Sequence, residues 1–344
     1  MMRGPARRGG RSWSKGFRCA VLLAVLPGCA WLTGCSTPRA PAATGRRLSS
    51  GDHTFILRHD GRTRRYIVHV PPAVRMGAQL PVMLAFHGGG GEAAGFKAYS
   101  GFDEIADREG FLVVYPYGTG PLRNRLLTWN GGTCCGYAVQ RAVDDVGFAV
   151  AVLDDLADRT AVDPARVYAS GHSNGAMMAY RLAAERADRI AAIVAVGGAM
   201  TLTKPFAPSR PVAVLHIHSV DDPRALYDGG LGPPFPGTNQ RQQHRPVQEA
   251  LDRWIERDGC ASPPDTIETR HGRDGAPDSG HTATRLAWKP CTNGYDVVHW
   301  KLTGAGHGWP GHERNESRES LIGPATTIVD AADEAWRFVR RFRR

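Results

Sequence analysis

The sequence predicts an α/β fold with a mostly parallel central sheet, helices on both faces of the sheet and an N-terminal antiparallel hairpin. Apolar runs alternate with helical patterns along the chain. These runs are continuously apolar, which is typical of strands buried on both faces under helices. With 344 residues, of which 42% are hydrophobic and 22% charged, the chain is long enough for one large α/β domain.

The expected elements follow from these patterns in chain order. Two short runs around Asp60 and Gly61 predict the opening hairpin, at residues 55–58 and 65–70. The expected buried strands are 82–86, 111–115, 166–169, 190–196, 212–217 and 297–302. Helical spacing of apolar residues predicts helices at 102–108, 143–158, 176–186, 247–257 and 331–341. Residues 229–237 and about 262–281, rich in Gly, Pro and polar residues, are expected to be loops.

The N-terminal segment resembles an export signal. Residues 1–34 hold six basic and no acidic residues, and their apolar run 20–26 is too short to span a bilayer. Residues 32–35 resemble the bacterial lipobox, in which Cys35 would be lipidated and anchor the protein to the membrane. The alternatives are a plain cleaved signal with an incidental cysteine, or a poorer lipobox ending at Cys29. We predict a signal peptide at 1–34 and a flexible tether at 35–47, rich in Ala, Pro and Arg.

The positive charge of the chain is concentrated near its ends. The formal net charge is +10, and without the six basic residues of the signal about +4 remains. Part of this remainder lies in residues 340–344. A charge of this size at a helix end is more typical of a solvated surface than of a phosphate-binding stripe. We therefore expect no nucleic-acid partner.

Four cysteines remain once the signal and the anchor are set aside. An even number in an exported protein suggests disulfides. Cys260 and Cys291 bracket a polar insertion, so a bridge between them is the first choice. Cys134 and Cys135 could form a vicinal disulfide or stay reduced, and the sequence leaves all three pairings of the four cysteines open.

The most informative motif is Gly-His-Ser-Asn-Gly at residues 171–175, between an expected strand and an expected helix. A Gly-x-Ser-x-Gly sequence in this setting is the nucleophile elbow of an α/β-hydrolase. The strained turn needs residues without a Cβ where strand and helix crowd it. The motif by itself proves little, but its context predicts Ser173 as a nucleophile.

A serine nucleophile needs a base, and the base needs an acid that orients it. In this fold the chain order is Ser, then Asp or Glu, then His. His307 lies in a glycine-rich loop after the last expected strand, so it is the predicted base. Asp221 and Asp222 follow the strand at 212–217, and the residues alone do not choose between them.

Residues 86–91, Phe-His-Gly-Gly-Gly-Gly, follow the first long strand and resemble the HGGG-type loop of an oxyanion hole. No Lys-Ser/Thr pair follows the glycines, which argues against a nucleotide P-loop. His87 is expected to stabilise this loop and not to act as a second base.

Two further features have competing interpretations. His216 and His218 share one face of a strand and could bind a metal, but no further ligand cluster has metal spacing. We therefore expect neither a metal nor a cofactor. The loop 129–136 could line a substrate pocket, with Trp129 stacking on a sugar or aromatic group, or be a disulfide-stiffened surface loop.

From about Arg47 onward the chain resembles the secreted esterase/polyhydroxybutyrate depolymerase-like family of the α/β-hydrolase superfamily. This family includes feruloyl and acetylxylan esterases and actinobacterial lipoproteins. The resemblance rests on residues 84–89, Trp129 and Asn130 with Cys134 and Cys135, residues 143–148, 162–168, the elbow and residues 306–310.

The resemblance implies that Ser173 is the nucleophile and His307 the base. It also implies that three backbone positions surround the oxyanion: Gly88, Gly89 and Asn174. The position of Trp309 is similar to one that lines the binding cleft in depolymerases. With Trp129 and Asn130, it is an expected substrate contact.

The acid of the family lies in a His-Gly-Thr-x-Asp-x-x-Val-Pro-Tyr pattern. Residues 218–227 align to this pattern without a gap, which places Asp222 as the acid. The chain departs from the pattern at four positions: Ser219, Val220, Ala225 and Leu226.

The resulting hypothesis is an exported, membrane-tethered serine esterase with a catalytic domain at 48–344. Its expected substrates are carboxylic esters of the feruloyl, acetyl-carbohydrate or hydroxyalkanoate type, small or carried on a polysaccharide or polyester. The alternatives are a serine peptidase of the same fold and a non-catalytic cell-surface binding lipoprotein. The sequence contains nothing that resembles a separate polymer-binding module.

Overall fold

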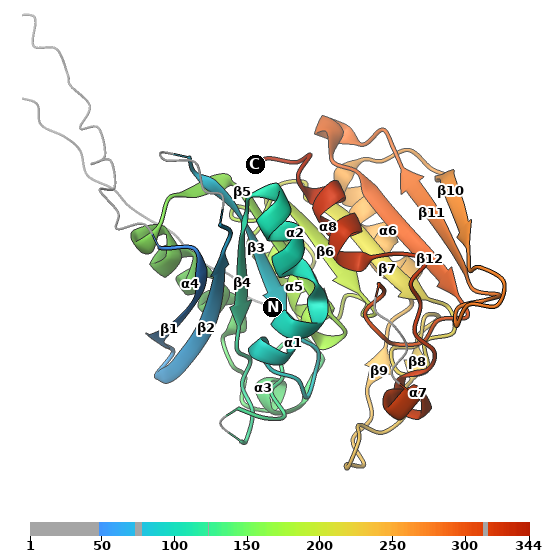
Figure 1. Ribbon diagram of the computed structural model, residues 1–344, viewed down its shortest axis with the longest axis horizontal. Helices are drawn as coiled ribbons and strands as arrows, with labels where there is room; N and C mark the ends of the chain where they lie inside the picture. The colour runs from blue at the N-terminus through green and yellow to red at the C-terminus, as the bar shows by residue number, and fades with distance from the viewer. Residues whose placement is uncertain (1–47, 73–77, 123, 312–315) are drawn as a thin grey trace, which may run out of the picture. The chain divides into compact units, whose positions relative to one another are not determined.

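The computed structural model describes residues 48–72, 78–122, 124–311 and 316–344, and these form a three-layer α/β/α arrangement (Figure 1). The signal peptide and tether predicted at 1–47 lie outside the described residues. One ten-stranded sheet runs through this part of the chain. Its strands, in spatial order, are β1 (Gly51–His59), β2 (Arg62–Val70), β4 (Leu112–Pro116), β3 (Leu80–Phe86), β5 (Val162–His172), β6 (Ala192–Val196), β7 (Ala213–Ser219), β12 (Val297–Thr303), β11 (Thr282–Trp288) and β10 (Asp265–His271).

The centre of the sheet is parallel and its two edges are antiparallel. Strands β4, β3, β5, β6, β7 and β12 pair in parallel with one another, in this order. Every residue of β3, β4, β6 and β7 is buried, which explains their continuous apolar sequences. The opening hairpin β1–β2 is antiparallel, as predicted. The expected fold class is therefore confirmed.

Two groups of helices cover the two faces of the sheet. The first group is α4 (Asp145–Arg159), α5 (Asn174–Glu185) and α6 (Val247–Asp258), and its side chains pack into one hydrophobic core. The second is α1 (Ala93–Ser100), α2 (Phe102–Glu109) and α8 (Ala331–Val339), which pack into the other. The caps follow ordinary rules: the Asp144 carboxylate accepts from the Gly147 N–H at the start of α4, and Gly259 in the left-handed conformation ends α6. The remaining short elements are α3 (Gly136–Gln140), β8 (Gly230–Leu231), β9 (Gln243–His244), the 3₁₀ turn η1 (Thr292–Gly294) and α7 (Glu316–Ile322).

The prediction of a loop at about 262–281 is wrong. Residues 265–271 form β10, which pairs with β11 as an antiparallel hairpin that extends the sheet beyond β12. The residues of β10 are mostly polar and exposed because the strand lies at the sheet edge, so the apolar pattern of a buried strand is absent. The expected loop at 229–237 also contains the two-residue strand β8, which pairs with β9.

The described cysteines form two disulfides. One joins Cys260, just after α6, to Cys291, just after β11, as preferred from the sequence. The other joins the neighbours Cys134 and Cys135.

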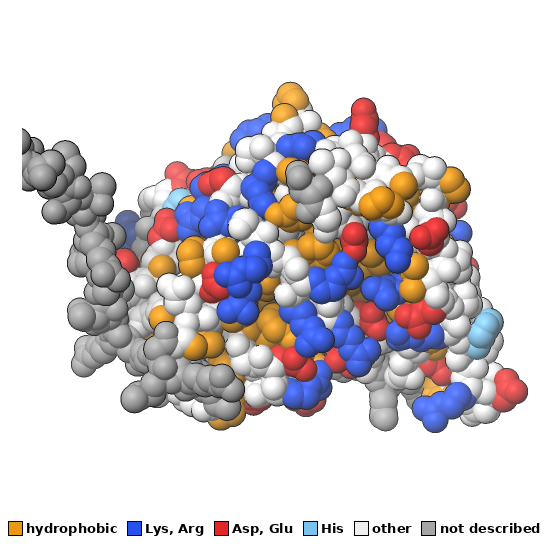
Figure 2. All heavy atoms as spheres, turned by 90° about the horizontal axis from the view of Figure 1, so that it is seen from above, with side chains coloured by type: hydrophobic (Ala, Val, Ile, Leu, Met, Phe, Trp, Pro, Cys, Tyr) orange, Lys and Arg blue, Asp and Glu red, His pale blue; other side chains and the backbone are white. Residues whose placement is uncertain are grey.

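The arginines of the C-terminal segment contact acidic groups and carbonyls of the domain. Arg340 pairs with Glu109, Arg343 with Asp163, and the Arg344 guanidinium donates to the Pro164 carbonyl. On the face shown in Figure 2, Lys and Arg side chains lie among Asp and Glu side chains. Across the described residues, we find no helix with the length and apolar character that crossing a membrane requires.

Candidate active site

The elbow is built as the Gly-x-Ser-x-Gly motif predicts. Ser173 sits between the last residue of β5 and the first of α5, with φ 57°, a backbone conformation that few non-glycine residues adopt. A Cβ on Gly171 would collide with the Gly175 backbone, and one on Gly175 with the Phe86 carbonyl. The two glycines therefore let strand, turn and helix approach closely enough to push Ser173 forward.

Ser173, His307 and Asp222 form a connected line of hydrogen bonds. The His307 Nε2 atom lies 2.9 Å from the Ser173 Oγ, and the His307 Nδ1 atom lies 2.7 Å from the Asp222 Oδ2. The three residues follow the carboxyl ends of β5, β12 and β7 respectively, which all face the same edge of the parallel sheet. This is the edge at which α/β proteins assemble their sites.

Asp222 is buried and fully hydrogen-bonded. Its Oδ1 accepts from the backbone N–H groups of Arg224 at 2.7 Å and Ala225 at 2.8 Å. Its Oδ2 contacts the His218 Nε2 at 3.1 Å as well as His307. Burial alone would raise the pKa of Asp222, but the charge of His307 and the hydrogen bonds from His218 and His307 hold it well below its usual range. Asp222 is therefore a carboxylate at neutral pH.

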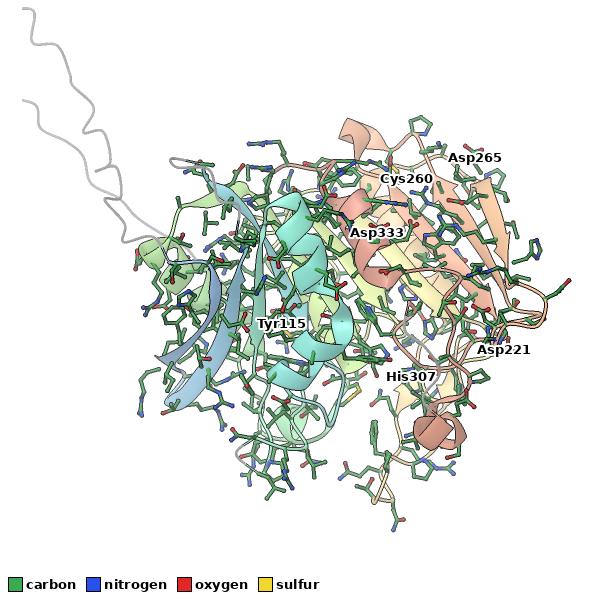
Figure 3. All side chains as sticks on the ribbon, viewed as in Figure 1. Tyr115, Asp221, Cys260, Asp265, His307 and Asp333 are labelled. Atoms are coloured by element: carbon green, nitrogen blue, oxygen red, sulfur yellow. A yellow bond between two sulfur atoms is a disulfide. The ribbon has the colours of Figure 1, made fainter. Side chains whose placement is uncertain are left out.

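Asp221 lies apart from this line. It is exposed, and its Oδ2 accepts from the Gly304 N–H at 2.7 Å. Figure 3 labels Asp221 and His307, which lie at the same end of the molecule, away from Cys260 and Asp265. Asp221 thus ties the end of β12 to the end of β7 without reaching the His307 ring.

The loop that carries His307 packs tightly against the segment after α7. The N–H of Gly306 donates to the Pro324 carbonyl at 2.7 Å, and that of His307 to the Ile322 carbonyl at 2.5 Å. A Cβ on Gly306 would collide with that Ile322 carbonyl, so the glycine permits the contact. The neighbouring His172 ring donates from Nε2 to the His307 carbonyl at 2.7 Å. Burial and the nearby His307 charge lower the pKa of His172 to about 3, so it is neutral.

The glycine loop after β3 lies against the elbow. A Cβ on Gly88 would be 3.5 Å from the Ser173 Cβ, and one on Gly89 would be 3.5 Å from the Asn174 Cβ. The Asn174 side chain is held on both sides by the backbone of Trp129, accepting from its N–H at 2.7 Å and donating to its carbonyl at 3.0 Å. The three residues expected around the oxyanion therefore lie together beside the Ser173 side chain.

His87 occupies a structural position in this loop. Its Nδ1 donates to the Gly88 carbonyl at 2.8 Å, and its Nε2 accepts from the Gly118 N–H at 3.0 Å. Burial lowers the pKa of His87 to about 4, so the ring stays neutral and both of its nitrogens are engaged. This agrees with a loop-stabilising role.

The three residues expected to contact substrate are placed differently from that expectation. Trp129 has no exposed surface and donates its indole N–H to the His87 carbonyl at 2.9 Å. Trp309 is 2% exposed, donates to the Ser100 carbonyl at 3.0 Å and packs against Phe96 and Phe102. Neither ring presents a face for stacking on a ligand, because both complete the packing behind the site.

The polar groups of Asn130 also form hydrogen bonds within the protein. Its side-chain amide donates to the Val143 carbonyl at 3.0 Å, its N–H donates to Asp145 at 2.8 Å, and its carbonyl accepts from Arg181 at 2.6 Å. It joins the loop at 129–136 to α4 and α5.

A cavity of about 540 Å³ lies at the β8–β9 hairpin, within the size range of ligand pockets. Its lining residues are Thr133, Asp228, Gly230, Arg241, Gln242, Gln243, His244, Arg245 and Pro246. Burial and the charge of His307 lower the pKa of His244 to about 4. A Cβ on Gly232 would meet both the His244 ring and the carbonyl of Arg224, two residues after Asp222, so this cavity wall lies next to the Asp222 turn. Phe235, just after β8, packs on Cys134, Cys135 and Met177 of the elbow helix. The vicinal cysteine loop and the hairpin therefore border the elbow together.

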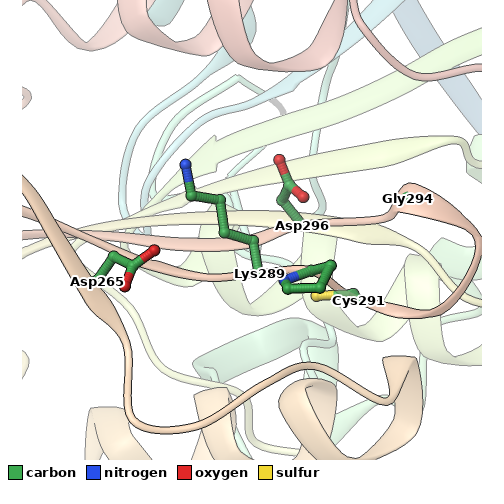
Figure 4. A pocket seen from close by; sticks show the side chains of 6 residues that line it. Asp265, Lys289, Cys291, Gly294 and Asp296 are labelled. Carbon is green, nitrogen blue, oxygen red and sulfur yellow. The ribbon is translucent and has the colours of Figure 1, made fainter.

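A second cavity, of about 390 Å³, is lined by Asp265, Lys289, Pro290, Cys291, Gly294 and Asp296 (Figure 4). Asp296 directly precedes β12, whereas His307 follows that strand. This cavity therefore opens at the opposite edge of the sheet from Ser173.

The described residues offer one group with metal-ligand spacing. It consists of Asp52, His69 and Asp103, which lie together on β1, β2 and α2. Lys97 forms ion pairs with both carboxylates, which offsets part of their negative charge. His216 and His218, the pair considered as metal ligands, instead hydrogen-bond to one another at 3.1 Å.

The sequence interpretation missed two residues of the site. His172 occupies a variable position of the elbow motif, so the motif assigns it no role, but its ring donates to the His307 carbonyl. His244 lies on β9, 63 positions before His307, and the charges of the two residues interact. No local pattern marks such a residue.

This fold and elbow define the class of the protein: it is an α/β-hydrolase with a Gly-x-Ser-x-Gly elbow. Within this class the chain belongs to the family described as esterase PHB depolymerase, whose model matches residues 64–240. That match includes Ser173 and Asp222 and ends before His307.

Relatives support the same assignment. A protein named "Putative esterase NocK", from Nocardia uniformis subsp. tsuyamanensis, is 30% identical over 94% of this chain and 97% of its own length. Feruloyl esterase D of Neurospora crassa is 25% identical over 94% of this chain and 95% of its own length. Among solved structures, an acetyl xylan esterase from Aspergillus awamori matches with a TM-score of 0.44 and 15% identity, covering 75% of this chain and 92% of that chain. The family match and the two named esterases together make the chain a member of a family of carboxylic ester hydrolases.

Proposed function

We propose that this protein hydrolyses carboxylic esters through a Ser173–His307–Asp222 triad and an acyl-enzyme. The observation that carries the proposal is the continuous line from the Ser173 Oγ to the His307 ring and the Asp222 carboxylate, at 2.9 and 2.7 Å. Hydrogen-bond distances between nucleophile, base and orienting acid are the geometric requirement for an activated serine.

Each group has one task in the reaction. The His307 Nε2 accepts the Ser173 proton as Oγ attacks the ester carbonyl carbon, and Asp222 holds the ring with Nδ1 protonated. Backbone N–H groups at Gly88, Gly89 and Asn174 stabilise the negative charge that develops on the carbonyl oxygen.

The tetrahedral intermediate then collapses. His307 returns the proton to the departing alcohol, and the acyl group stays on the Ser173 Oγ. A water molecule, deprotonated by the same imidazole, then attacks the acyl carbonyl carbon. The bond from this carbon to the Ser173 Oγ breaks, His307 returns the proton to Oγ, and the acid is released.

The proposed substrates are esters of the feruloyl, acetyl-carbohydrate or hydroxyalkanoate type, by analogy with the names of the relatives and of the family. The cavity at the β8–β9 hairpin is the proposed position of the group next to the scissile bond. Its lining includes His244 near the base and Thr133 on the loop beside the elbow.

A panel of acetyl, feruloyl and hydroxybutyrate esters tests both the activity and its specificity. Replacement Ser173→Ala should lower kcat on the preferred ester by about 10⁴-fold or more, because the nucleophile is lost while the fold is kept. A fluorophosphonate probe should label the wild type at Ser173 and not the variant, since only an activated serine reacts. Full turnover in Ser173→Ala would contradict the proposal.

We also propose that the protein is exported and anchored to a bacterial membrane through lipid on Cys35. The support is the basic and apolar pattern of residues 1–34 followed by the lipobox-like sequence at 32–35.

A further inference from the structure

A line of buried polar side chains continues behind Asp222, on the side away from Ser173. The Tyr180 hydroxyl lies 2.9 Å from the His216 Nδ1, and the His216 Nε2 lies 3.1 Å from the His218 Nδ1. The His218 Nε2 lies 3.1 Å from the Asp222 Oδ2. All these side chains are buried, and they belong to α5, β7 and the turn after β7. Apolar residues would fill such a core without the cost of burying polar groups, so the line calls for an explanation.

The protons along this line run in one direction. The His218 Nε2 also lies 2.8 Å from the Ala225 carbonyl, which can only accept, so Nε2 carries a hydrogen. With the ring neutral, the His218 Nδ1 accepts, and the His216 Nε2 must donate to it. The His216 Nδ1 then accepts from the Tyr180 hydroxyl. Every donor therefore points toward the Asp222 carboxylate.

The carboxylate is held from four directions as a result. Its Oδ1 receives two backbone N–H groups, and its Oδ2 receives the His307 Nδ1–H and the His218 Nε2–H. Without His218, Oδ2 would face a buried gap on one side. The Asp222 carboxylate would then have one hydrogen-bond donor fewer to stabilise its negative charge, and it would attract the His307 ring more strongly.

We propose that His218 is a positioning residue of the triad, and that His216 and Tyr180 serve it by holding its protonated nitrogen toward Asp222. This inference rests on the proposed triad and extends it by three residues that do not touch the substrate. It also gives a role to the histidine pair on β7 that no metal site explains.

The remaining titratable groups packed around the line belong to other elements. His299 on β12 donates from Nδ1 to the His216 carbonyl at 3.1 Å and accepts from the Tyr227 hydroxyl at 2.9 Å. The Tyr227 ring packs edge-on against His218, and the ammonium of Lys301 lies over its face. His244 lies on the hairpin near the base. His299 is equally buried and its ring packs against the His216 ring, with 5.4 Å between the ring centroids. Its two nitrogens bond to the His216 carbonyl and the Tyr227 hydroxyl and not to a side chain of the line, which makes it a control for burial and ring packing.

The first test compares two replacements of His218 on the preferred ester. His218→Phe keeps the ring volume and removes both nitrogens, so kcat should fall about 10- to 100-fold with KM unchanged, as expected for one lost charge-assisted hydrogen bond. In the pH profile of kcat/KM, the acid limb should move to higher pH, because the His307 imidazolium interacts more strongly with Asp222. His218→Gln places an amide donor near the Nε2 position and should keep kcat within about fivefold of the wild type.

The control His299→Gln should leave the acid limb in place. If His218 had only a structural role, His218→Phe and His299→Gln would both lower the free energy of unfolding. Neither replacement would then move the acid limb of the pH profile of kcat/KM. An unshifted limb and unchanged kcat in a folded His218→Phe, judged by circular dichroism, would overturn the proposal.

The second test measures which ring nitrogens of His216 and His218 carry hydrogen in the wild type. Long-range ¹H–¹⁵N spectra of histidine-labelled protein should show His216 and His218 protonated on Nε2 and not on Nδ1. Tyr180→Phe should lower kcat by a smaller factor, about two- to fivefold, because it acts through two rings. Protonation of either ring at Nδ1 would overturn the proposed direction. If the wild type hydrolyses esters and Ser173→Ala does not, the proposed function stands whatever these tests give.

Discussion

At the scale of single residues, the neighbours Asp221 and Asp222 have opposite environments although both follow β7. Asp222 is buried between His307 and His218, whereas Asp221 is exposed and accepts one backbone N–H. The turn after Ser219 sends consecutive side chains to different sides, so Asp222 reaches the His307 ring and Asp221 reaches the Gly304 N–H. The resemblance to the family pattern selected the same residue before any geometry was considered.

We therefore expect Asp222→Asn to lower kcat by about 10³–10⁴-fold, because an amide would favour the wrong tautomer of His307. Asp221→Asn should keep kcat within about threefold, since an amide oxygen can still accept from the Gly304 N–H. Steady-state kinetics of the two variants, matched in position and chemistry, measures the difference. Equal losses in both would contradict the assignment of the acid.

Asp258, at the end of α6, predicts a pH dependence of stability that is separate from catalysis. Burial raises its pKa to about 7, against the partly compensating charges of Arg257 and Arg210. Between about pH 4 and 7 the folded state therefore binds more protons here than the unfolded state, so this group lowers stability as pH rises.

Replacement Asp258→Asn should raise the free energy of unfolding by about 1–3 kcal/mol at pH 8 and have little effect at pH 4. Denaturant unfolding at both pH values measures this. Glu256→Gln, exposed on the same helix, is the control and should change neither value. A stabilisation equal at both pH values would show that Asp258 is not the titrating group.

At the scale of elements, the strands differ in how well the sequence marks them. Strands β3, β4, β6 and β7 are buried on both faces, and their apolar sequences predict them directly. Strands β10 and β11 form an antiparallel edge with mixed polar and apolar residues, and they are absent from the sequence-based prediction. An edge strand is held by backbone pairing to its neighbour, which leaves a weak side-chain pattern.

The disulfide Cys260–Cys291 closes the chain segment that contains this β10–β11 hairpin. Its two cysteines are 31 positions apart, and a loop of that length predicts about 3–4 kcal/mol of stabilisation. The double replacement Cys260→Ser with Cys291→Ser should lower the unfolding free energy by roughly that amount.

The kcat of this double variant on the preferred ester should stay near the wild-type value at 25 °C, because Cys260 lies at the opposite edge of the sheet from His307 (Figure 3). Thermal unfolding and kinetics on the same preparation measure both effects. A large fall in kcat in the folded variant would show that the hairpin also shapes the site.

At the scale of the whole molecule, the charge of the chain divides between its predicted signal and its surface. The C-terminal arginines pair with carboxylates from separate elements, Glu109 of α2 and Asp163 of β5 among them. These pairs place positive and negative charges side by side on the surface.

The anchor at Cys35 is tested in a bacterial host that processes lipoproteins. The full chain should partition into the membrane fraction and the detergent phase, because an attached diacylglyceryl group adds apolar chains that the domain lacks. Cys35→Ser should move the protein to the soluble extracytoplasmic or unprocessed fraction with unchanged specific activity. Equal partitioning of both forms would contradict a lipid anchor at this position.

The sequence by itself determined the layered fold, the elbow with Ser173 and the glycine loop. Its resemblance to a family also pointed to Asp222. These features depend on residues close together in the chain, where strand periodicity, turn strain and motif spacing act.

Only the tertiary structure decided what the other side chains do. It buried Trp129 and Trp309 behind the site, brought His244 near the base and connected Tyr180, His216 and His218 to Asp222. The contacts of Tyr180 with His216, of Trp129 with His87 and of Trp309 with Ser100 join elements that are distant in the chain. Their side chains meet because the sheet order places β5, β6, β7 and β12 side by side, and no local pattern of residues contains that order.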